Sequence, residues 1–199
     1  MVDDGSEDAT VDVAAPFAQH LHIIHTGHRG VAAARNTGWR AAGADMIAFL
    51  DGDDVWLPEK LKWELDALAT QPDAALIYSD TMRIRPDGTP IDRWGVHMRP
   101  VAGDSLLPML RQNRVHTSTV VMRRDVLEEL GGFDETLPGW EDIDLWTRTA
   151  ARYPFGYVDR VLARYRMHAH GISHRAMDLA DGRLTSTQRL LQDLPLSRA

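Results

Sequence analysis

Three carboxylates in four residues follow a short apolar run near the first quarter of the chain. The run is "MIAFL" at residues 46–50, and the acids are Asp51, Asp53 and Asp54. Ligands of open α/β sheets bind where strands end at their carboxyl termini. Carboxylate oxygens suit Mg²⁺ or Mn²⁺, which complete their coordination with phosphate oxygens and water. Two interpretations follow: a divalent-cation site, or a solvated acidic turn in which Asp54 caps the next helix.

A second acidic group, in the stretch "WEDIDLW", contains Glu141, Asp142 and Asp144. We expect all three in the first turn of a helix over residues 141–153. Acids are favoured there by the helix dipole, by about 0.3–1 kcal/mol each, so their position alone needs no catalytic explanation.

Composition narrows the function classes. The chain has 199 residues, 44 % of them apolar and 26 % charged, which is sufficient for one well-filled domain. Its formal charge of −7 argues against nucleic acid as the main partner. The absence of cysteine excludes disulfides and thiolate chemistry. No apolar run approaches the ~20 residues of a membrane span, and no signal segment opens the chain, so a cytoplasmic location is expected.

Strand and helix patterns alternate along the chain, which predicts an α/β fold with a mostly parallel sheet flanked by helices. Strands are expected at 20–25, 46–50, 74–80, 117–122 and within 157–167, and helices at 30–44, 58–68, 105–111, 123–130 and 141–153. The helix after Pro58 carries Leu61, Leu65 and Leu68 on one side. We expect a domain over residues 1–174 and a C-terminal amphipathic helix over 175–199 that packs on it.

The order of short motifs resembles one known family. The stretches "VDDGSEDAT", "GVAAARNTG", "FLDGDD", "GGFDE", "GWEDIDLW" and "RYRMHAHGIS" occur in the order and at the spacing seen in family 2 glycosyltransferases. These are inverting enzymes with a GT-A nucleotide-sugar-binding fold, and the resemblance covers most of residues 2–173. It implies transfer of a sugar from a nucleotide-diphosphate sugar, with UDP- or dTDP-sugars as the usual donors and Mg²⁺ or Mn²⁺ as the cofactor.

The resemblance also implies roles for the donor side. Asp3 and Asp4 match acids that approach the nucleobase and ribose. Arg35 matches an arginine that contacts the base, although an ordinary helix-surface arginine is the alternative. Asp53 matches the metal-ligating acid of the Asp-x-Asp motif, and Asp51 would lie near the ribose or a metal-bound water.

Catalytic roles follow from the same resemblance. Asp142 matches the general base that takes the acceptor's hydroxyl proton, and Glu141 is its neighbour on the acceptor side. His168 matches a late histidine that would bind the metal or a phosphate, with a structural role as the alternative, and Arg166 is a second phosphate contact. One base and one metal suffice for this chemistry, because the cation takes up the charge of the leaving diphosphate.

The chain departs from the family pattern at its start. Family members have an apolar first strand and a helix before the "VDDGS" motif, and here both are missing. Three explanations remain. The chain is a shortened form of an intact enzyme, it is a decayed remnant, or a partner supplies the missing strand. The complete set of downstream motifs favours the first explanation. We expect this shortened chain to be weakly stable and poorly active, because loss of the strand exposes sheet edges and opens the nucleotide pocket.

Two rival functions remain. A Mg²⁺ phosphohydrolase or nucleotidyltransferase would want a nucleophilic-aspartate context or a glycine-rich phosphate loop, and neither is present. A sugar-nucleotide-binding remnant with little or no activity is the second rival.

The implied partners are the nucleotide sugar and a saccharide or lipid-linked acceptor, in polysaccharide or glycolipid assembly. The C-terminal helix, with arginines among its leucines, either contacts the inner membrane face or packs on the domain. The sequence does not indicate the donor sugar, the acceptor, the linkage or the oligomeric state.

Overall fold

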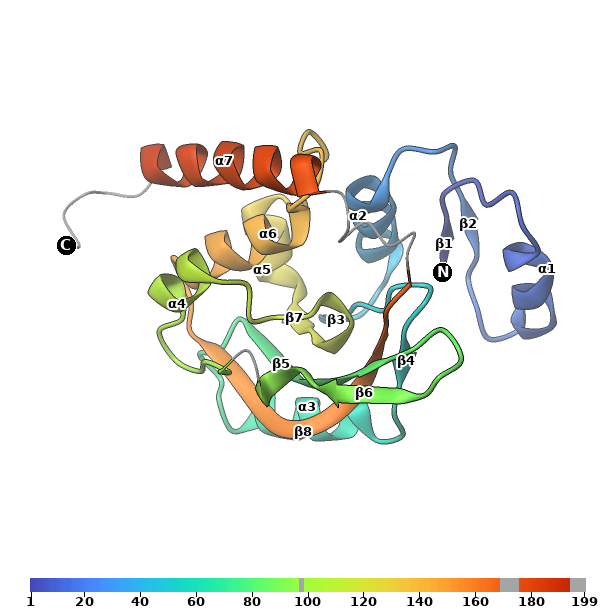
Figure 1. Ribbon diagram of the computed structural model, residues 1–199, viewed down its shortest axis with the longest axis horizontal. Helices are drawn as coiled ribbons and strands as arrows, with labels where there is room; N and C mark the ends of the chain where they lie inside the picture. The colour runs from blue at the N-terminus through green and yellow to red at the C-terminus, as the bar shows by residue number, and fades with distance from the viewer. Residues whose placement is uncertain (97–98, 169–175, 194–199) are drawn as a thin grey trace.

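The structure is a computed structural model, and it describes residues 1–96, 99–168 and 176–193. Its elements alternate along the chain as the sequence predicts, which confirms the α/β class (Figure 1). The strands are β1 (Val2–Asp3), β2 (Ile24–His25), β3 (Met46–Ala48), β4 (Val55–Trp56), β5 (Leu76–Ile84), β6 (Pro90–Arg93), β7 (Val121–Arg123) and β8 (Phe155–Arg166). The α-helices are α1 (Thr10–Ala14), α2 (Val31–Ala41), α3 (Lys60–Ala69), α4 (Leu106–Arg111), α5 (Arg124–Leu130), α6 (Glu141–Ala150) and α7 (Ala176–Asp193).

Six of the strands form one curled, mixed sheet. Its strand order is β3-β7-β5-β8-β4, and β6 pairs with the far end of β5. The pairings make β3, β5 and β8 run in one direction and the other three strands run against them. The strand predicted at 117–122 is divided: Thr117–Thr119 forms a 3-10 helix, and only the residues after it join the sheet as β7.

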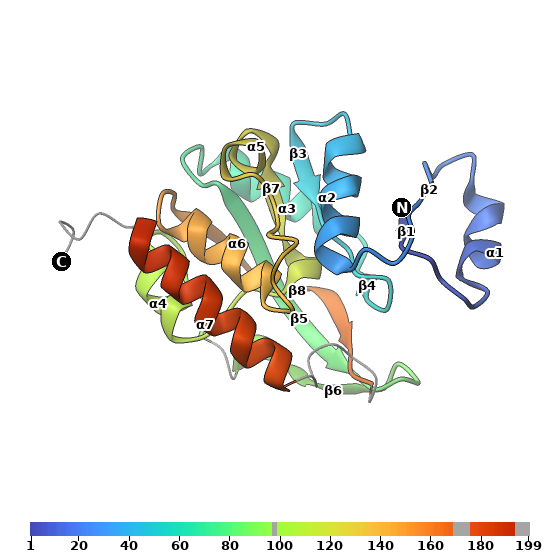
Figure 2. The same cartoon turned by 90° about the horizontal axis from the view of Figure 1, so that it is seen from above.

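The first two strands form a separate parallel pair, in which Val2 is opposite Ile24. This pair lies beside α2, on the side away from the main sheet (Figure 2). Gly38 of α2 allows the close approach, since an added Cβ would stand 3.3 Å from the Val2 side chain. Within the described residues, no strand pairing joins the β1–β2 pair to the six-stranded sheet.

Helices cover both faces of the sheet (Figure 1). The larger core lies between the sheet and helices α5 and α6, and includes the fully buried Trp146. Ile143, Trp146 and Ala150 of α6 are all buried. Helix α7 packs on the outer side of α6. No helix in the described ranges is long and apolar enough to cross a membrane. The division of the chain at residue 174 stays a prediction.

Helix α3 covers the other face of the sheet, and of its three leucines Leu68 packs against the core there while the other two are exposed. Leu61 and Leu65 are 40 % and 41 % exposed, whereas Lys60 and Glu64 are almost fully buried. The Lys60 ammonium lies 2.5 Å from the Glu64 carboxylate, whose other oxygen accepts a hydrogen bond from Ser79 on β5. Burial lowers the pKa of Lys60 and raises that of Glu64, while each charge favours the other.

We predict that Lys60→Met destabilises the chain strongly, by about 3–5 kcal/mol, because it leaves the Glu64 carboxylate buried without a cation. Equilibrium urea unfolding measures the loss. The double variant Lys60→Met/Glu64→Leu should recover most of it, because well-packed apolar groups can replace a buried pair. The control Lys62→Met, on the exposed side of the same helix, should stay within about 0.5 kcal/mol of the parent. A single Lys60 variant as stable as that control would show that the pair is dispensable.

Candidate active site

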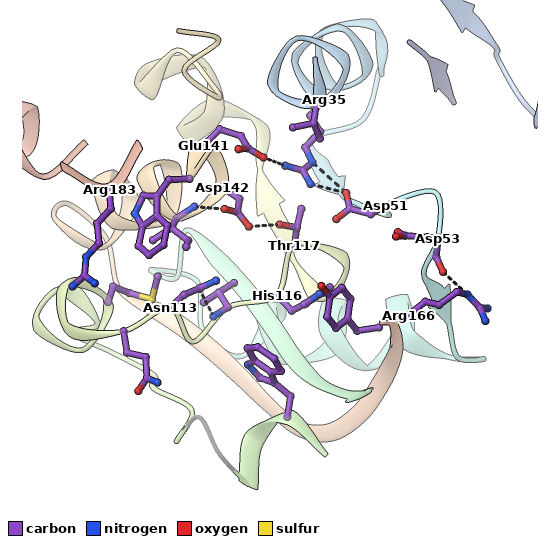
Figure 3. A pocket seen from close by; sticks show the side chains of 18 of the residues that line it. Arg35, Asp51, Asp53, Asn113, His116, Thr117, Glu141, Asp142, Arg166 and Arg183 are labelled. Carbon is purple, nitrogen blue, oxygen red and sulfur yellow. Dashed lines mark hydrogen bonds and ion pairs between the residues drawn. The ribbon is translucent and has the colours of Figure 1, made fainter. Parts of the chain in front are cut away.

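A cleft of about 790 Å³ opens between α2, α4, α6, α7 and the end of β8 (Figure 3). Of the nine residues to which the family resemblance gives roles, seven line it: Arg35, Asp51, Asp53, Glu141, Asp142, Arg166 and His168. They come from four separate segments of the chain. The two exceptions are Asp3 and Asp4, which do not line this cleft.

The acidic loop after β3 is anchored by its last carboxylate. Asp54 is buried, and its two oxygens accept hydrogen bonds from the Ser118 hydroxyl, at 2.6 Å, and the Arg166 backbone N–H, at 3.0 Å. The same Ser118 oxygen accepts the Asp51 backbone N–H at 3.1 Å. Burial raises the pKa of Asp54, while nearby His116 and the hydrogen bonds favour its charged form. The expectation that Asp54 caps the next helix is therefore wrong, and Asp51 and Asp53 are the acids that face the cleft.

Arg35 joins two parts of the cleft that are far apart in the sequence. Its guanidinium donates to Asp51 Oδ1 at 2.7 Å and to Glu141 Oε1 at 2.7 Å (Figure 3). The side chain is only 13 % exposed. Its burial opposes charge, but the carboxylates of Asp51, Asp142 and Glu141 more than compensate and raise its pKa. Arg35 is therefore a partner of acids in the cleft wall and no ordinary surface arginine.

A buried amide fixes the helix that carries Arg35. Asn36 is 1 % exposed and makes hydrogen bonds to both the N–H and the C=O of Phe133, at 3.0 and 2.8 Å. Gly132, with a φ of 77°, lies against this amide, and an added Cβ would come within 2.5 Å of its oxygen. The "GGFDE" stretch is thereby held to α2, which sets the position of the neighbouring arginine.

The first turn of α6 presents two carboxylates with different surroundings. Glu141 is 7 % exposed, and both its burial and the nearby charge of Asp142 raise its pKa, against the opposing effect of Arg35. Asp142 is half-buried. One of its oxygens accepts the Thr117 hydroxyl at 2.9 Å and the other accepts the Ile143 backbone N–H at 2.7 Å. Asp142 is thus held in a fixed orientation at the cleft wall by two neutral donors.

The residue before this turn has unusual backbone geometry. Trp140 has a φ of 71°, in the left-handed region that non-glycine residues rarely adopt. Its ring lines the cleft beside the Arg183 guanidinium, which lies 5.6 Å from the ring centroid. This half-buried position is compatible both with stacking on a sugar and with packing in the wall of the cleft.

The opposite end of the cleft holds a carboxylate–imidazole pair. His168 Nε2 lies 2.8 Å from Asp53 Oδ2, and Arg166 donates to the Asp53 backbone carbonyl at 3.0 Å. Within the described ranges, no group of three or more histidines and acids could hold a metal ion by itself. The Asp53 carboxylate nevertheless fits Mg²⁺ or Mn²⁺, whose remaining ligands in such sites are phosphate oxygens and water, and the His168 imidazole lies beside it.

Asp3 and Asp4 support the loop before α2. The Asp4 carboxylate accepts hydrogen bonds from Thr26 Oγ1 and from the backbone N–H groups of Arg29 and Gly30. Its partial burial opposes charge, but these bonds keep its pKa below the ordinary value. Asp3 is buried and interacts with His25 at 3.2 Å. Their expected contact with a nucleotide stays a prediction.

Comparison with known proteins places these features in a family. Residues 1–177 match the family described as glycosyltransferase like family 2. The chain belongs to this family. The predicted membership and enzyme class, glycosyltransferase, are therefore confirmed at the family level.

Relatives of this glycosyltransferase family come from several bacteria. The chain is 32 % identical to the pre-mycofactocin glycosyltransferase of Mycobacterium tuberculosis over 74 % of its own length and 33 % of that protein. It is 27 % identical to a putative teichuronic acid biosynthesis glycosyltransferase of Bacillus subtilis, over 87 % of this chain and 68 % of the relative. An uncharacterized glycosyltransferase of Rickettsia felis is 26 % identical over 85 % of this chain and 29 % of its own length. The chain thus spans about a third of some of these relatives.

Solved structures confirm the GT-A fold. Staphylococcus aureus TarS in complex with UDP-GlcNAc superposes with a TM-score of 0.75 at 17 % identity, over 98 % of this chain and 58 % of that one. A mannosyltransferase from Pyrobaculum calidifontis in complex with GDP-Man and Mn²⁺ gives 0.70 at 20 % identity, over 98 % and 55 %. At such identities the likeness shows the fold alone.

Sequence reasoning did not identify several residues of this glycosyltransferase cleft. Thr117 and Ser118 precede β7, in a stretch predicted as strand, and nothing local marks them as partners of Asp142 and Asp54. His116 lies 3.8 Å from Asp54 in the cleft wall. Arg183 is one of the arginines of the last helix, which was expected to contact the membrane face or to pack on the domain, and it lines the cleft.

We predict that Arg35→Met destabilises the chain by roughly 3 kcal/mol near neutral pH, because it leaves the buried Glu141 and its neighbours without a cation. The pKa of Glu141 already lies above its ordinary value of 4.5, so its ionisation opposes folding, and removal of Arg35 increases this effect. The destabilisation should therefore shrink as pH falls to about 4 and the carboxylates become protonated. Urea unfolding at both pH values tests this.

Arg29→Met, which removes an exposed pair with Glu135, is the control, with an expected change below about 1 kcal/mol. A pH-independent loss in Arg35→Met would contradict the assignment.

Proposed function

We propose that this chain transfers a sugar from a nucleotide-diphosphate sugar to an acceptor hydroxyl with inversion, and that Asp142 is the general base. The observation that carries the proposal is the convergence of Asp142 and the Asp53–His168 pair on one cleft, in a chain of this family.

The surroundings of Asp142 suit a base. The Thr117 hydroxyl and the Ile143 N–H fix the orientation of the carboxylate, while each of its oxygens retains a further acceptor position. In the proposed reaction the acceptor oxygen attacks the anomeric carbon, the bond from that carbon to the diphosphate breaks, and the hydroxyl proton passes to Asp142. Such help is typically worth ~10²–10⁴ in rate. Glu141 is bound to Arg35 and would contact the acceptor side only indirectly.

The donor would lie at the Asp53 end. Asp53 and His168 would hold Mg²⁺ or Mn²⁺, which would neutralise the charge that develops on the leaving diphosphate. Arg166 suits a phosphate contact, because its guanidinium donates to backbone carbonyls of Asp53 and Pro86 and keeps its full charge. Asp51 and Arg35 would face the nucleoside. Asp3 and Asp4 complete the base pocket in this proposal.

The same proposal includes a UDP- or dTDP-sugar as donor and a saccharide or lipid-linked acceptor. It also includes a cytoplasmic location at the inner membrane face. Support for the donor class comes from the two solved glycosyltransferases, whose complexes contain UDP-GlcNAc in one case and GDP-Man with Mn²⁺ in the other. Support for a cell-envelope setting comes from the teichuronic acid relative.

One observation favours the second candidate, a sugar-nucleotide-binding protein with little transfer activity. The β1–β2 pair is not joined to the main sheet in the described residues, and Asp3 and Asp4 do not line the cleft. A donor pocket that is incomplete on this side would lower the affinity for the nucleoside more than it would lower the rate of transfer at Asp142.

We predict that Asp142→Asn lowers the release of nucleoside diphosphate from nucleotide sugars ~10²–10⁴-fold, since the amide cannot accept the proton. Calorimetric affinity for the donor should change less than about threefold, because the amide occupies the same volume. Asp66→Asn, an exposed acid on α3, is the control and should leave both values unchanged. Full turnover in Asp142→Asn would exclude this residue as the base.

We further predict that UDP or GDP binds with Mn²⁺ and that Asp53→Ala reduces this binding at least about tenfold, because half of the protein's metal ligands are lost. Isothermal titration with and without Mn²⁺ measures the effect, and Asp66→Ala is the matched control. Nucleotide binding that is independent of both Mn²⁺ and Asp53 would argue against the metal-assisted mechanism. A folded sample that binds no nucleoside diphosphate would contradict the proposed function as a whole.

A further inference from the structure

Helix α7 contributes to the cleft, although most of it lies beyond the family match. That match ends at residue 177, whereas α7 continues to Asp193. Its residue Arg183 lines the cleft beside Trp140, at the end opposite Asp53 (Figure 3). This end of the cleft is therefore built by a segment that the family pattern does not include.

The position of α7 is set by three residues at a spacing of four. Gly182 has no side chain at a point where a Cβ would come within 2.2 Å of the Gly139 carbonyl oxygen. The buried Ser186 donates to Asp144 of α6 at 2.7 Å. Leu190 is 6 % exposed. These contacts hold the helix directly against the turn that precedes Glu141, so Arg183 has a defined place in the cleft.

The charge of Arg183 is left available. Its guanidinium rests on the Trp140 ring, and no carboxylate of the described residues pairs with it or with Arg111, which also lines the cleft. Six residues further along α7, Arg189 pairs with Asp134, and Arg35 in the same cleft pairs with two acids. In a chain with 29 acids and 22 basic residues, two unpaired guanidinium groups in one cleft are a distinctive feature.

We propose that the Arg183 end of the cleft binds an anionic group, a phosphate or a carboxylate, carried by the saccharide acceptor. The term acceptor rests on the function proposed above. Guanidinium groups bind both anions through two parallel hydrogen bonds. The Trp140 ring offers an apolar face to the sugar that bears the anion. The carboxylate of Asp142 and the diphosphate that the proposed donor places at the Asp53 end repel a second anion from the rest of the cleft, so the acceptor is oriented with its charged end toward α7.

The test compares three probes of similar size on the full chain: glucose 1-phosphate, glucuronate and methyl glucoside. Dissociation constants are measured by NMR titration in the presence of UDP and Mn²⁺, which occupy the donor end, and again without them. We expect an anionic probe to bind at least about tenfold more tightly than methyl glucoside. A preference for glucose 1-phosphate or for glucuronate identifies which anion the site takes.

Variants of α7 decide whether Arg183 is responsible. Arg183→Gln should abolish the preference for the anionic probe, and Arg183→Lys should restore part of it because the charge remains without the planar fork. Arg189→Gln removes the same charge from the same helix outside the cleft and should keep the preference. Equal affinity for all three probes, or a preference that survives Arg183→Gln, would overturn the inference. The UDP titration reports separately on the proposed function, because it does not depend on Arg183.

Discussion

The cleft depends on one cation between acids that would otherwise repel one another. Asp51 follows β3 and Glu141 begins α6, and 90 residues separate them in the sequence. Arg35 satisfies both carboxylates through different nitrogens of one planar group. Asn36, the next residue, holds α2 to the Phe133 backbone, so the arginine is placed by a buried amide that has no contact with the acids themselves. Arg35, which bonds to both acids, and Asn36, which fixes α2, together set the distance between the two halves of the cleft.

A second chain of contacts joins the acidic loop to the opposite face of the sheet. The Lys60 ammonium, paired with Glu64, lies 4.6 Å from the centre of the Trp56 ring. The Trp56 indole donates to the Ser118 carbonyl at 2.7 Å, and the Ser118 hydroxyl bonds to Asp51 and Asp54. The buried ion pair beneath the sheet therefore contributes to the rigidity of the loop above it, through a short path of packed aromatic and polar groups.

Sequence patterns predicted most helices and strands correctly, but they did not predict which polar side chains are buried. Helices α5 and α6 have strong periodicity and clear ends, such as Gly131 with its φ of 77°, and both were expected where they occur. The buried side of α3 was missed because Lys60 and Glu64 read as surface residues, and only their pairing permits their burial. The stretch 117–122 has a strand composition, but its first half forms a 3-10 helix that places Thr117 in the cleft wall and Ser118 against Asp54. Such roles depend on partners distant in the chain and leave no local signal.

The turn before α6 is strained at Trp140. Glycine adopts a φ near 71° without steric conflict, whereas a bulky side chain in that region costs about 1–2 kcal/mol. The indole offsets part of this cost, because it packs against the core that contains Trp146 and also lines the cleft. A change at this residue that relieves the backbone would therefore also remove contacts in the core and in the cleft wall, so this one turn couples the stability of the fold to the shape of the cleft.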